Sequence, residues 1–202
     1  MKKLMLAAVA LMATMSVNAQ QMFIKPMVGA TLSTVTGDYT DDAKMRFGLA
    51  AGAEFGYQVM EPLAITAGAI VSMQGAGQDD TKYYRDASTT LTYLNIPILA
   101  NYQIIPGLSV KAGIQPGFML SAKSKGEEHL GTGWVEYDHS GTDGYKTFDL
   151  SIPFGLSYEI SDFVIDARYN LGLSNMLDID GHSDYSQKNS VIMLTVGYKI
   201  PF

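Results

Sequence analysis

The sequence predicts an all-β protein, an eight-stranded antiparallel up-and-down transmembrane β-barrel preceded by a cleavable signal peptide. Three observations favour this fold class. The chain starts with the layout of an export signal, the remainder divides into eight segments in which apolar and polar residues alternate, and the connections are alternately short and long. Alternation with a period of two is typical of strands whose two faces meet different surroundings.

The first element is the expected signal peptide, residues 1–19. Lys2 and Lys3 form a basic start, residues 4–15 are apolar, and Val-Asn-Ala at 17–19 is a small-residue cleavage site. A buried amphipathic helix is the less favoured alternative. We therefore expect export and a single β-barrel domain over residues 20–202, which is one domain at roughly 150 residues per domain.

The eight alternating segments are the expected strands. A tilted strand crosses a bilayer with about 9–11 residues, and each segment has at least 12. No later apolar run approaches the ~20 residues of a membrane-spanning helix. The strands are expected at 22–35, 44–58, 63–76, 89–104, 108–122, 146–160, 162–175 and 189–202.

The connections indicate the orientation of the barrel. Those at 60–62, 105–107 and 161–162 are short and rich in turn residues. The others are longer, rich in glycine and aspartate, and the largest runs from 123 to 145. Short turns at one end and long loops at the other are typical of outer-membrane barrels. We expect the protein in the cell outer membrane, with outer-membrane lipid around it.

The two faces of the strands differ in charge. In the last segment, Ile192, Leu194 and Val196 share one face, and the apolar face carries no charged residue in any of the eight. A lysine or arginine facing lipid at mid-bilayer costs about 2–4 kcal/mol, whereas buried charges persist when paired. We expect a charge network in the barrel interior, formed by the nearly balanced set Lys25, Arg46, Glu54, Lys111, Asp149, Glu159, Asp166, Arg168 and Lys199.

Alternation alone also fits a soluble periplasmic carrier of the lipocalin type, in which the apolar face lies inside. The aromatic residues favour the membrane barrel, because a soluble barrel has no reason to collect them at one level. Those expected at the membrane interface lie on the apolar face beside the short turns. They are Tyr57, Tyr102, Tyr158, Phe163, Tyr198 and Phe202.

Three stretches resemble the PorT-like outer-membrane β-barrel proteins of the porin family. Residues 93–102 resemble the "YLxIPxLxxY" strand of that family, residues 167–173 resemble its "ARYxxGL" strand, and residues 196–202 fit its ending. The resemblance implies a small outer-membrane barrel, and the namesake of the family participates in protein secretion. The ending at Phe202 also resembles the signal for barrel insertion, so the barrel-insertion machinery is an expected partner.

Composition and motifs limit the chemistry. The 202 residues include no cysteine, which excludes disulfide scaffolds and thiol catalysis. The net charge of −6 disfavours a nucleic-acid partner, since phosphates require a basic face. The candidate ligands His129, His139, His182, Asp178, Asp180 and Asp184 lie in expected loops and lack the spacing of zinc or calcium sites. We expect no cofactor, no metal and no enzyme; a lipid hydrolase at the barrel rim is a weaker alternative.

An interior of eight strands is just wide enough to be filled by side chains. We therefore expect a closed barrel with a structural or interaction role, which presents loops 36–43, 77–88, 123–145 and 176–188. The alternatives are a narrow transport channel or an accessory component of a protein-secretion machine, and the soluble carrier.

Overall fold

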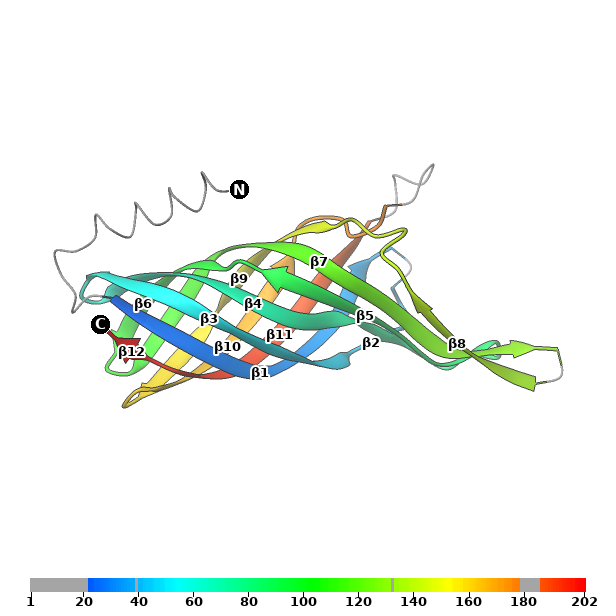
Figure 1. Ribbon diagram of the computed structural model, residues 1–202, viewed down its shortest axis with the longest axis horizontal. Coiled ribbons are helices and arrows are strands. Elements are labelled where there is room, and N and C mark those ends of the chain that lie inside the picture. Colours follow the sequence, from blue (N-terminus) through cyan, green and yellow to red (C-terminus); the bar gives the residue numbers. More distant parts are fainter. Residues whose placement is uncertain (1–21, 39, 132, 179–185) are drawn as a thin grey trace.

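The computed structural model describes residues 22–38, 40–131, 133–178 and 186–202, which form one antiparallel sheet closed on itself (Figure 1). The expected signal peptide at 1–19 lies outside the described residues. The strands are β1 (Met22–Gly37), β2 (Ala43–Lys44), β3 (Arg46–Met60), β4 (Leu63–Gln78), β5 (Tyr84–Asn95), β6 (Ile98–Ile105), β7 (Leu108–Leu130), β8 (Gly133–Ser140), β9 (Phe148–Ile160), β10 (Phe163–Gly172), β11 (Gln187–Tyr198) and β12 (Ile200–Pro201).

The ring has eight strand positions, which we call staves. They are β1, β3, β4, the pair β5 and β6, β7, β9, β10, and β11 with its extension β12. Each stave pairs with the next along the chain, and β11 pairs with β1 from Met27 opposite Gly197 to Gly37 opposite Gln187, which closes the ring. Closure gives every stave of the ring a partner on both sides, as lipid requires of a spanning sheet. The predicted eight-stranded antiparallel up-and-down barrel is confirmed. No helix among the described residues is long and apolar enough to cross a membrane.

Two regions differ most clearly from the sequence prediction. The segment expected at 89–104 is divided into β5 and β6 around Pro97, because proline has no N–H to donate to the ladder. The prediction of a loop at 123–145 is wrong over most of that range. There β7 continues to Leu130 and pairs with β8, with Gly131 at the turn in a left-handed conformation (φ +64°).

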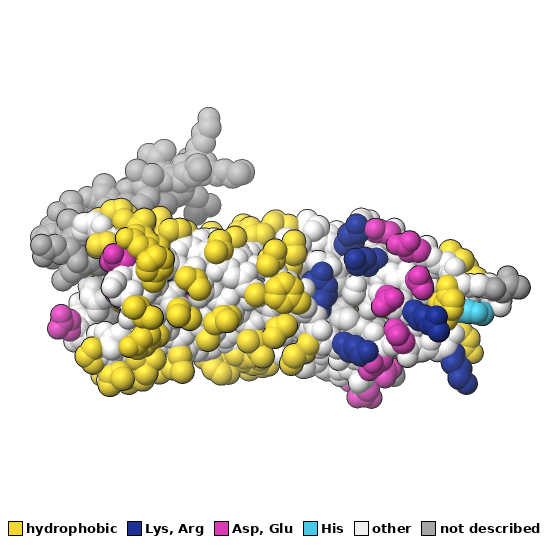
Figure 2. Space-filling view, turned by 90° about the horizontal axis from the view of Figure 1, so that it is seen from below, with side chains coloured by type: hydrophobic (Ala, Val, Ile, Leu, Met, Phe, Trp, Pro, Cys, Tyr) yellow, Lys and Arg dark blue, Asp and Glu magenta, His cyan; other side chains and the backbone are white. Residues whose placement is uncertain are grey.

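The apolar face of the strands, which we also call the apolar parity, lies on the outside of the barrel. Ile192, Leu194 and Val196 are 43%, 53% and 48% exposed, and on the face shown in Figure 2 hydrophobic side chains cover the part of the barrel next to the short turns. Charged side chains gather at the opposite end in the same view. A lipocalin-like carrier would bury the apolar parity, so this arrangement contradicts the soluble alternative.

The interior is filled with side chains of mixed character. At the end with the short turns, the ring of Phe23 points inward and occupies the space that a Cβ of Gly56 would need, so a side chain at position 56 would require this ring to shift. Two buried apolar clusters lie farther along the lumen. One consists of Met27, Ala50, Ile70 and Met193, and the other of Leu91, Tyr93, Met119, Ala122 and Met176.

Candidate functional site

The most concentrated group of charges in the barrel is a set of five residues that we call the charge cluster. It comes from four staves, because β1 and β3 place Lys25 opposite Glu54, β7 supplies Lys111, and β10 supplies Asp166 and Arg168 two residues apart. A spacing of two puts both β10 side chains on the lumen face. All five residues are between 0 and 4% exposed.

Arg168 lies at the centre of the charge cluster. Its Nη2 donates to Glu54 Oε1 and to Asp166 Oδ2, both at 2.8 Å, and its Nε donates to Asp166 Oδ1 at 2.9 Å. Lys25 Nζ lies 2.8 Å from Glu54 Oε2 and 3.6 Å from Asp166 Oδ2. Lys111 Nζ also donates to Asp166 Oδ2. Three cations therefore face two carboxylates.

The other four residues expected in the interior network lie elsewhere. Lys199 Nζ pairs with Glu159 at 2.9 Å near the short turns, where both side chains are partly exposed. Asp149 is buried and accepts a bond of 2.6 Å from the Ser174 hydroxyl. Arg46 makes no ion pair within the described part of the chain, and its Nη1 is buried without a hydrogen-bond partner. The structure thus brings five of the nine residues into one cluster and two into a separate pair, while Asp149 and Arg46 belong to neither.

Below the charge cluster, toward the short turns, lies a pocket of about 140 Å³ that we call the turn-end pocket. Lys25 and Lys111 reach it from the charge cluster, and Lys199 and Glu159 line it near the turns. Most of its remaining lining is polar and uncharged: Gln58, Thr66, Asn101, Gln103, Ser109 and Ser157. The sequence prediction contained four of these charges but not the cavity between them.

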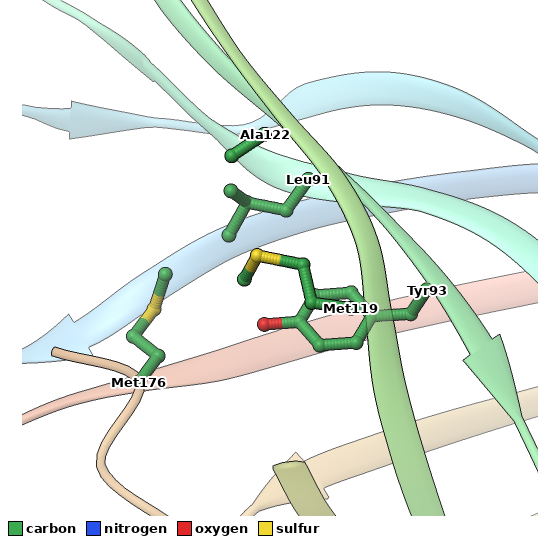
Figure 3. Packing of buried hydrophobic residues seen from close by; sticks show 5 residues of the cluster. All are labelled: Leu91, Tyr93, Met119, Ala122 and Met176. Atoms are coloured by element: carbon green, nitrogen blue, oxygen red, sulfur yellow. The ribbon is translucent and has the colours of Figure 1, made fainter. Parts of the chain in front are cut away.

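Toward the opposite end, the second apolar cluster forms a layer of packed side chains within the lumen (Figure 3). Met176 reaches it from the segment after β10, which is held by bonds of 2.8 Å from Met176 N to Gln187 O and from Lys146 N to Met176 O. Sequence reasoning missed this layer. Leu91 and Tyr93 share the face of Asn95, so an apolar stretch on the otherwise polar parity was the available signal.

A cavity of about 260 Å³ lies on the loop side of this layer. Leu91 and Met176 contribute apolar surface, Asp42 and Gln187 contribute polar groups, and Tyr137 lines it from β8. Burial raises the pKa of the Tyr137 hydroxyl.

The upper parts of β5 and β7, together with β8, form a three-stranded ribbon that projects beyond the rest of the barrel (Figure 1). The guanidinium of Arg85 lies 4.2 Å from the centre of the Trp134 ring, and the His129 ring meets Trp134 edge-on at 5.0 Å. Lys123 pairs with Asp138 at 3.0 Å. We call this segment, 84–88 with 123–140, the ribbon.

The expected loop ligands are placed in part. His129 and His139 lie in β7 and β8 rather than in a loop, and the backbone N–H of Asp178 bonds Gly144 O at 2.9 Å. Positions 180, 182 and 184 lie outside the described residues. Over the ranges that the structure covers, no three His, Asp or Glu side chains are placed to hold a metal ion.

The aromatic residues expected at the membrane interface lie on the outer surface of the barrel, near the short turns. Phe163 and Tyr198 meet edge-on at 5.2 Å between ring centres, and the Tyr198 hydroxyl donates to Asp162 at 3.1 Å. Tyr102, Tyr158 and Phe202 are exposed, and Tyr57 is half-buried. Their contact with lipid stays a prediction.

Comparison with known proteins agrees with this geometry. The family described as outer membrane protein beta-barrel domain matches residues 11–178. No curated protein matches the sequence. Among solved structures, Ail, the attachment invasion locus protein of Yersinia pestis, in complex with the heparin analogue sucrose octasulfate, is 19% identical with a TM-score of 0.50, covering 89% of this chain and 99% of its own.

Two further solved barrels overlap with most of the chain. Neisserial surface protein A is 10% identical with a TM-score of 0.47, and OprG from Pseudomonas aeruginosa is 13% identical with a TM-score of 0.43. Each match covers 90% of this chain and 97% of the other. At these identities, the likeness to Ail concerns the fold alone.

Proposed function

The chain belongs to the outer membrane protein beta-barrel domain family and lies in the outer membrane, and from this premise we propose that it is a closed barrel that anchors an extracellular interaction surface. The end with the short turns faces the periplasm, as in bacterial outer-membrane barrels. The ribbon then projects from the outer surface of the cell.

The filled lumen is the observation that carries this proposal. The charge cluster joins β1, β3, β7 and β10 across the interior, and Glu54 and Arg168 within it are inaccessible to solvent. The two apolar clusters occupy further parts of the lumen toward the loops. Water-filled channels belong to barrels with about twice as many strands.

The ribbon supports the interaction role. Within the described residues, β8 pairs with β7 alone, so the outer edge of β8 offers unpaired backbone groups. Val135 and Leu130 are exposed beside Trp134, and the ribbon carries both acidic and basic side chains. An exposed edge strand is a template for pairing with another chain.

Recording from planar bilayers tests closure. We expect no steady conductance from the purified protein, because the buried side chains of the charge cluster occupy the lumen. Reproducible conductance steps, altered in current or ion selectivity by Arg168→Met, would instead support the narrow transport channel. A conductance that this substitution does not alter would point to leakage around the barrel rather than through it.

A shortened ribbon tests the interaction role. Gly126 and Tyr137 are register partners, so replacing residues 127–136 with a two-residue Asn-Gly turn leaves the rest of the ladder paired. Cross-linking on intact cells should yield a ribbon-dependent product that this variant loses. Glu61→Gln, in a turn at the opposite end of the barrel, is the matched control and should retain the product.

A second candidate is the narrower role within the PorT-like group, an accessory part of a protein-secretion machine. The resemblance of residues 93–102 and 167–173 to strands of that group favours it. Deletion of the gene should then reduce the amount of secreted protein, and full-length protein should restore it. We further propose that the barrel-insertion machinery recognises the strand ending at Phe202, so removal of this residue should lower the inserted fraction.

A further inference from the structure

We propose that the turn-end pocket is a binding site for a small oxyanion of the phosphate class, reached from the periplasmic side. The inference concerns a ligand held inside the lower barrel, and it is independent of what the ribbon contacts.

The first argument is the charge balance at the floor of the pocket. The charge cluster holds three cations and two carboxylates, and the nearest further pair, Lys199 with Glu159, is neutral as a unit. One positive charge is therefore left over within the charge cluster. The remaining buried carboxylate, Asp149, lies six residues along β9 from Gly155, the register partner of Lys111, and is bonded to Ser174 instead. A buried charge is costly unless it is compensated. An anion in the adjoining pocket would supply the missing negative charge.

The second argument is the number of donors aimed at one acceptor. Asp166 Oδ2 accepts from Arg168 Nη2 at 2.8 Å and from Lys111 Nζ, and Lys25 Nζ lies 3.6 Å away. A carboxylate oxygen has two lone pairs, whereas each ammonium group has three N–H donors. Lys25 and Lys111 thus have donor capacity beyond these contacts, and both side chains line the pocket.

The third argument is the character of the walls. Hydroxyl and amide groups from five staves line the pocket, including Thr66, Asn101, Ser109 and Ser157. Asn101 Nδ2 donates to Thr66 Oγ1 at 3.1 Å and to Leu99 O at 3.4 Å. The single acid in the lining, Glu159, is paired with Lys199 at 2.9 Å. Donors dominate, and a volume of about 140 Å³ admits one tetrahedral anion with water.

The site is a closed end rather than an entrance to a channel. Beyond Lys25 and Lys111, the lumen is occupied by Glu54 and Arg168, which bond each other at 2.8 Å and have no exposed side-chain surface. An anion would enter from the periplasm, bind against the two lysines and leave by the same route.

Calorimetric titration of the full-length barrel in non-ionic detergent with inorganic phosphate, in a chloride-free HEPES buffer, tests the proposal. We expect saturable binding with one phosphate per barrel. Ser157→Asp introduces an acid into the pocket wall while keeping the charge cluster, and it should abolish binding. Lys111→Gln removes one charged donor and should weaken binding about tenfold or more. Lys123→Gln, in the ribbon, is the matched control and should bind as the native protein does.

Folding of each variant is checked by the heat-dependent shift in gel mobility, and Ser157→Asp keeps the test decisive where Lys111→Gln does not fold. Absence of saturable binding by the native protein would overturn the proposal. So would equal binding by the folded Ser157→Asp protein, or an equal loss in Lys123→Gln. Displacement of phosphate by an equal concentration of chloride would overturn the assignment to oxyanions.

Discussion

Replacement of Glu54 by glutamine is the sharpest test of how the charge cluster stabilises the barrel. Glu54 uses both oxygens, one toward Arg168 and one toward Lys25, each at 2.8 Å. The glutamine side chain keeps the shape and one acceptor oxygen, but it turns an N–H group toward one of the two cations. Three cations would then face Asp166 alone.

The magnitude follows from these contacts. A hydrogen bond to a charged group contributes about 1.5–3 kcal/mol, and removing one partner of a buried ion pair costs about 3–5 kcal/mol because the remaining charge is uncompensated. We expect Glu54→Gln to lower the free energy of unfolding by about 3–5 kcal/mol. Lys25→Met is the matched comparison. It leaves two cations with two carboxylates, each still bonded, so we expect a cost of at most about 2 kcal/mol.

The assay is equilibrium unfolding by urea of barrels refolded into lipid vesicles, in phosphate-free buffer so that anion binding does not contribute. Gel mobility reports the barrel, and the fluorescence of Trp134, the single tryptophan, reports the ribbon. Equal costs for Glu54→Gln and Lys25→Met, or a larger cost for Lys25→Met, would refute the reasoning from charge balance.

Three further predictions concern other parts of the barrel. Gly56→Ala places a methyl group in the ring of Phe23, and we expect a loss of about 1–3 kcal/mol in unfolding free energy from overpacking. Leu194→Lys puts a charge on the lipid face in the middle of β11, and we expect a loss of about 2–4 kcal/mol in vesicles. Asp79, by its hydrogen bond and its charge, raises the pKa of Lys44 outside the membrane, so this pair favours the folded state below the ordinary lysine pKa and loses its effect as the pH rises through the raised value. Asp79→Asn should lower the Lys44 pKa toward its ordinary value in an NMR titration.

Control substitutions separate these effects from a general sensitivity of the barrel to mutation. Gly133→Ala meets no atom within 4 Å and should be nearly neutral, so a loss equal to that of the change at Gly56 would contradict the packing argument. Val135→Lys, on the exposed ribbon, should change stability by about 0.5 kcal/mol or less. A similar loss at Leu194 and Val135 would contradict the lipid-facing assignment, and an unchanged Lys44 pKa in Asp79→Asn would contradict the pairing.

The ring and its orientation could be predicted from the sequence because lipid excludes charge from one face of every strand. The apolar residues Ile192, Leu194 and Val196 follow this pattern at a spacing of two. The short turns mark one end of the barrel. The rule stops where the chain leaves the membrane. Residues 123–140 carry charge on both faces, so their pairing into a hairpin gave no apolar periodicity to detect.

The interior could be predicted only in part, because alternation assigns a face but not what lies across the lumen. Asp149 and Lys199 share the lumen parity with Arg168, yet neither is bonded to the charge cluster. The inner apolar layer also depends on an irregularity. The register between β5 and β7 shifts at Thr92 and Tyr93, which skips one residue of β7 and brings both Met119 and Ala122 inward.

The seam between β1 and β11 determines how the barrel is completed. These strands are the first and last of the sheet in chain order. The sheet therefore stays open, with two free edges, until β11 pairs with β1. Before that moment both margins expose peptide groups that hydrocarbon cannot solvate. A partly closed sheet is therefore unstable in the bilayer interior. We expect insertion and closure of the barrel to occur as one concerted event.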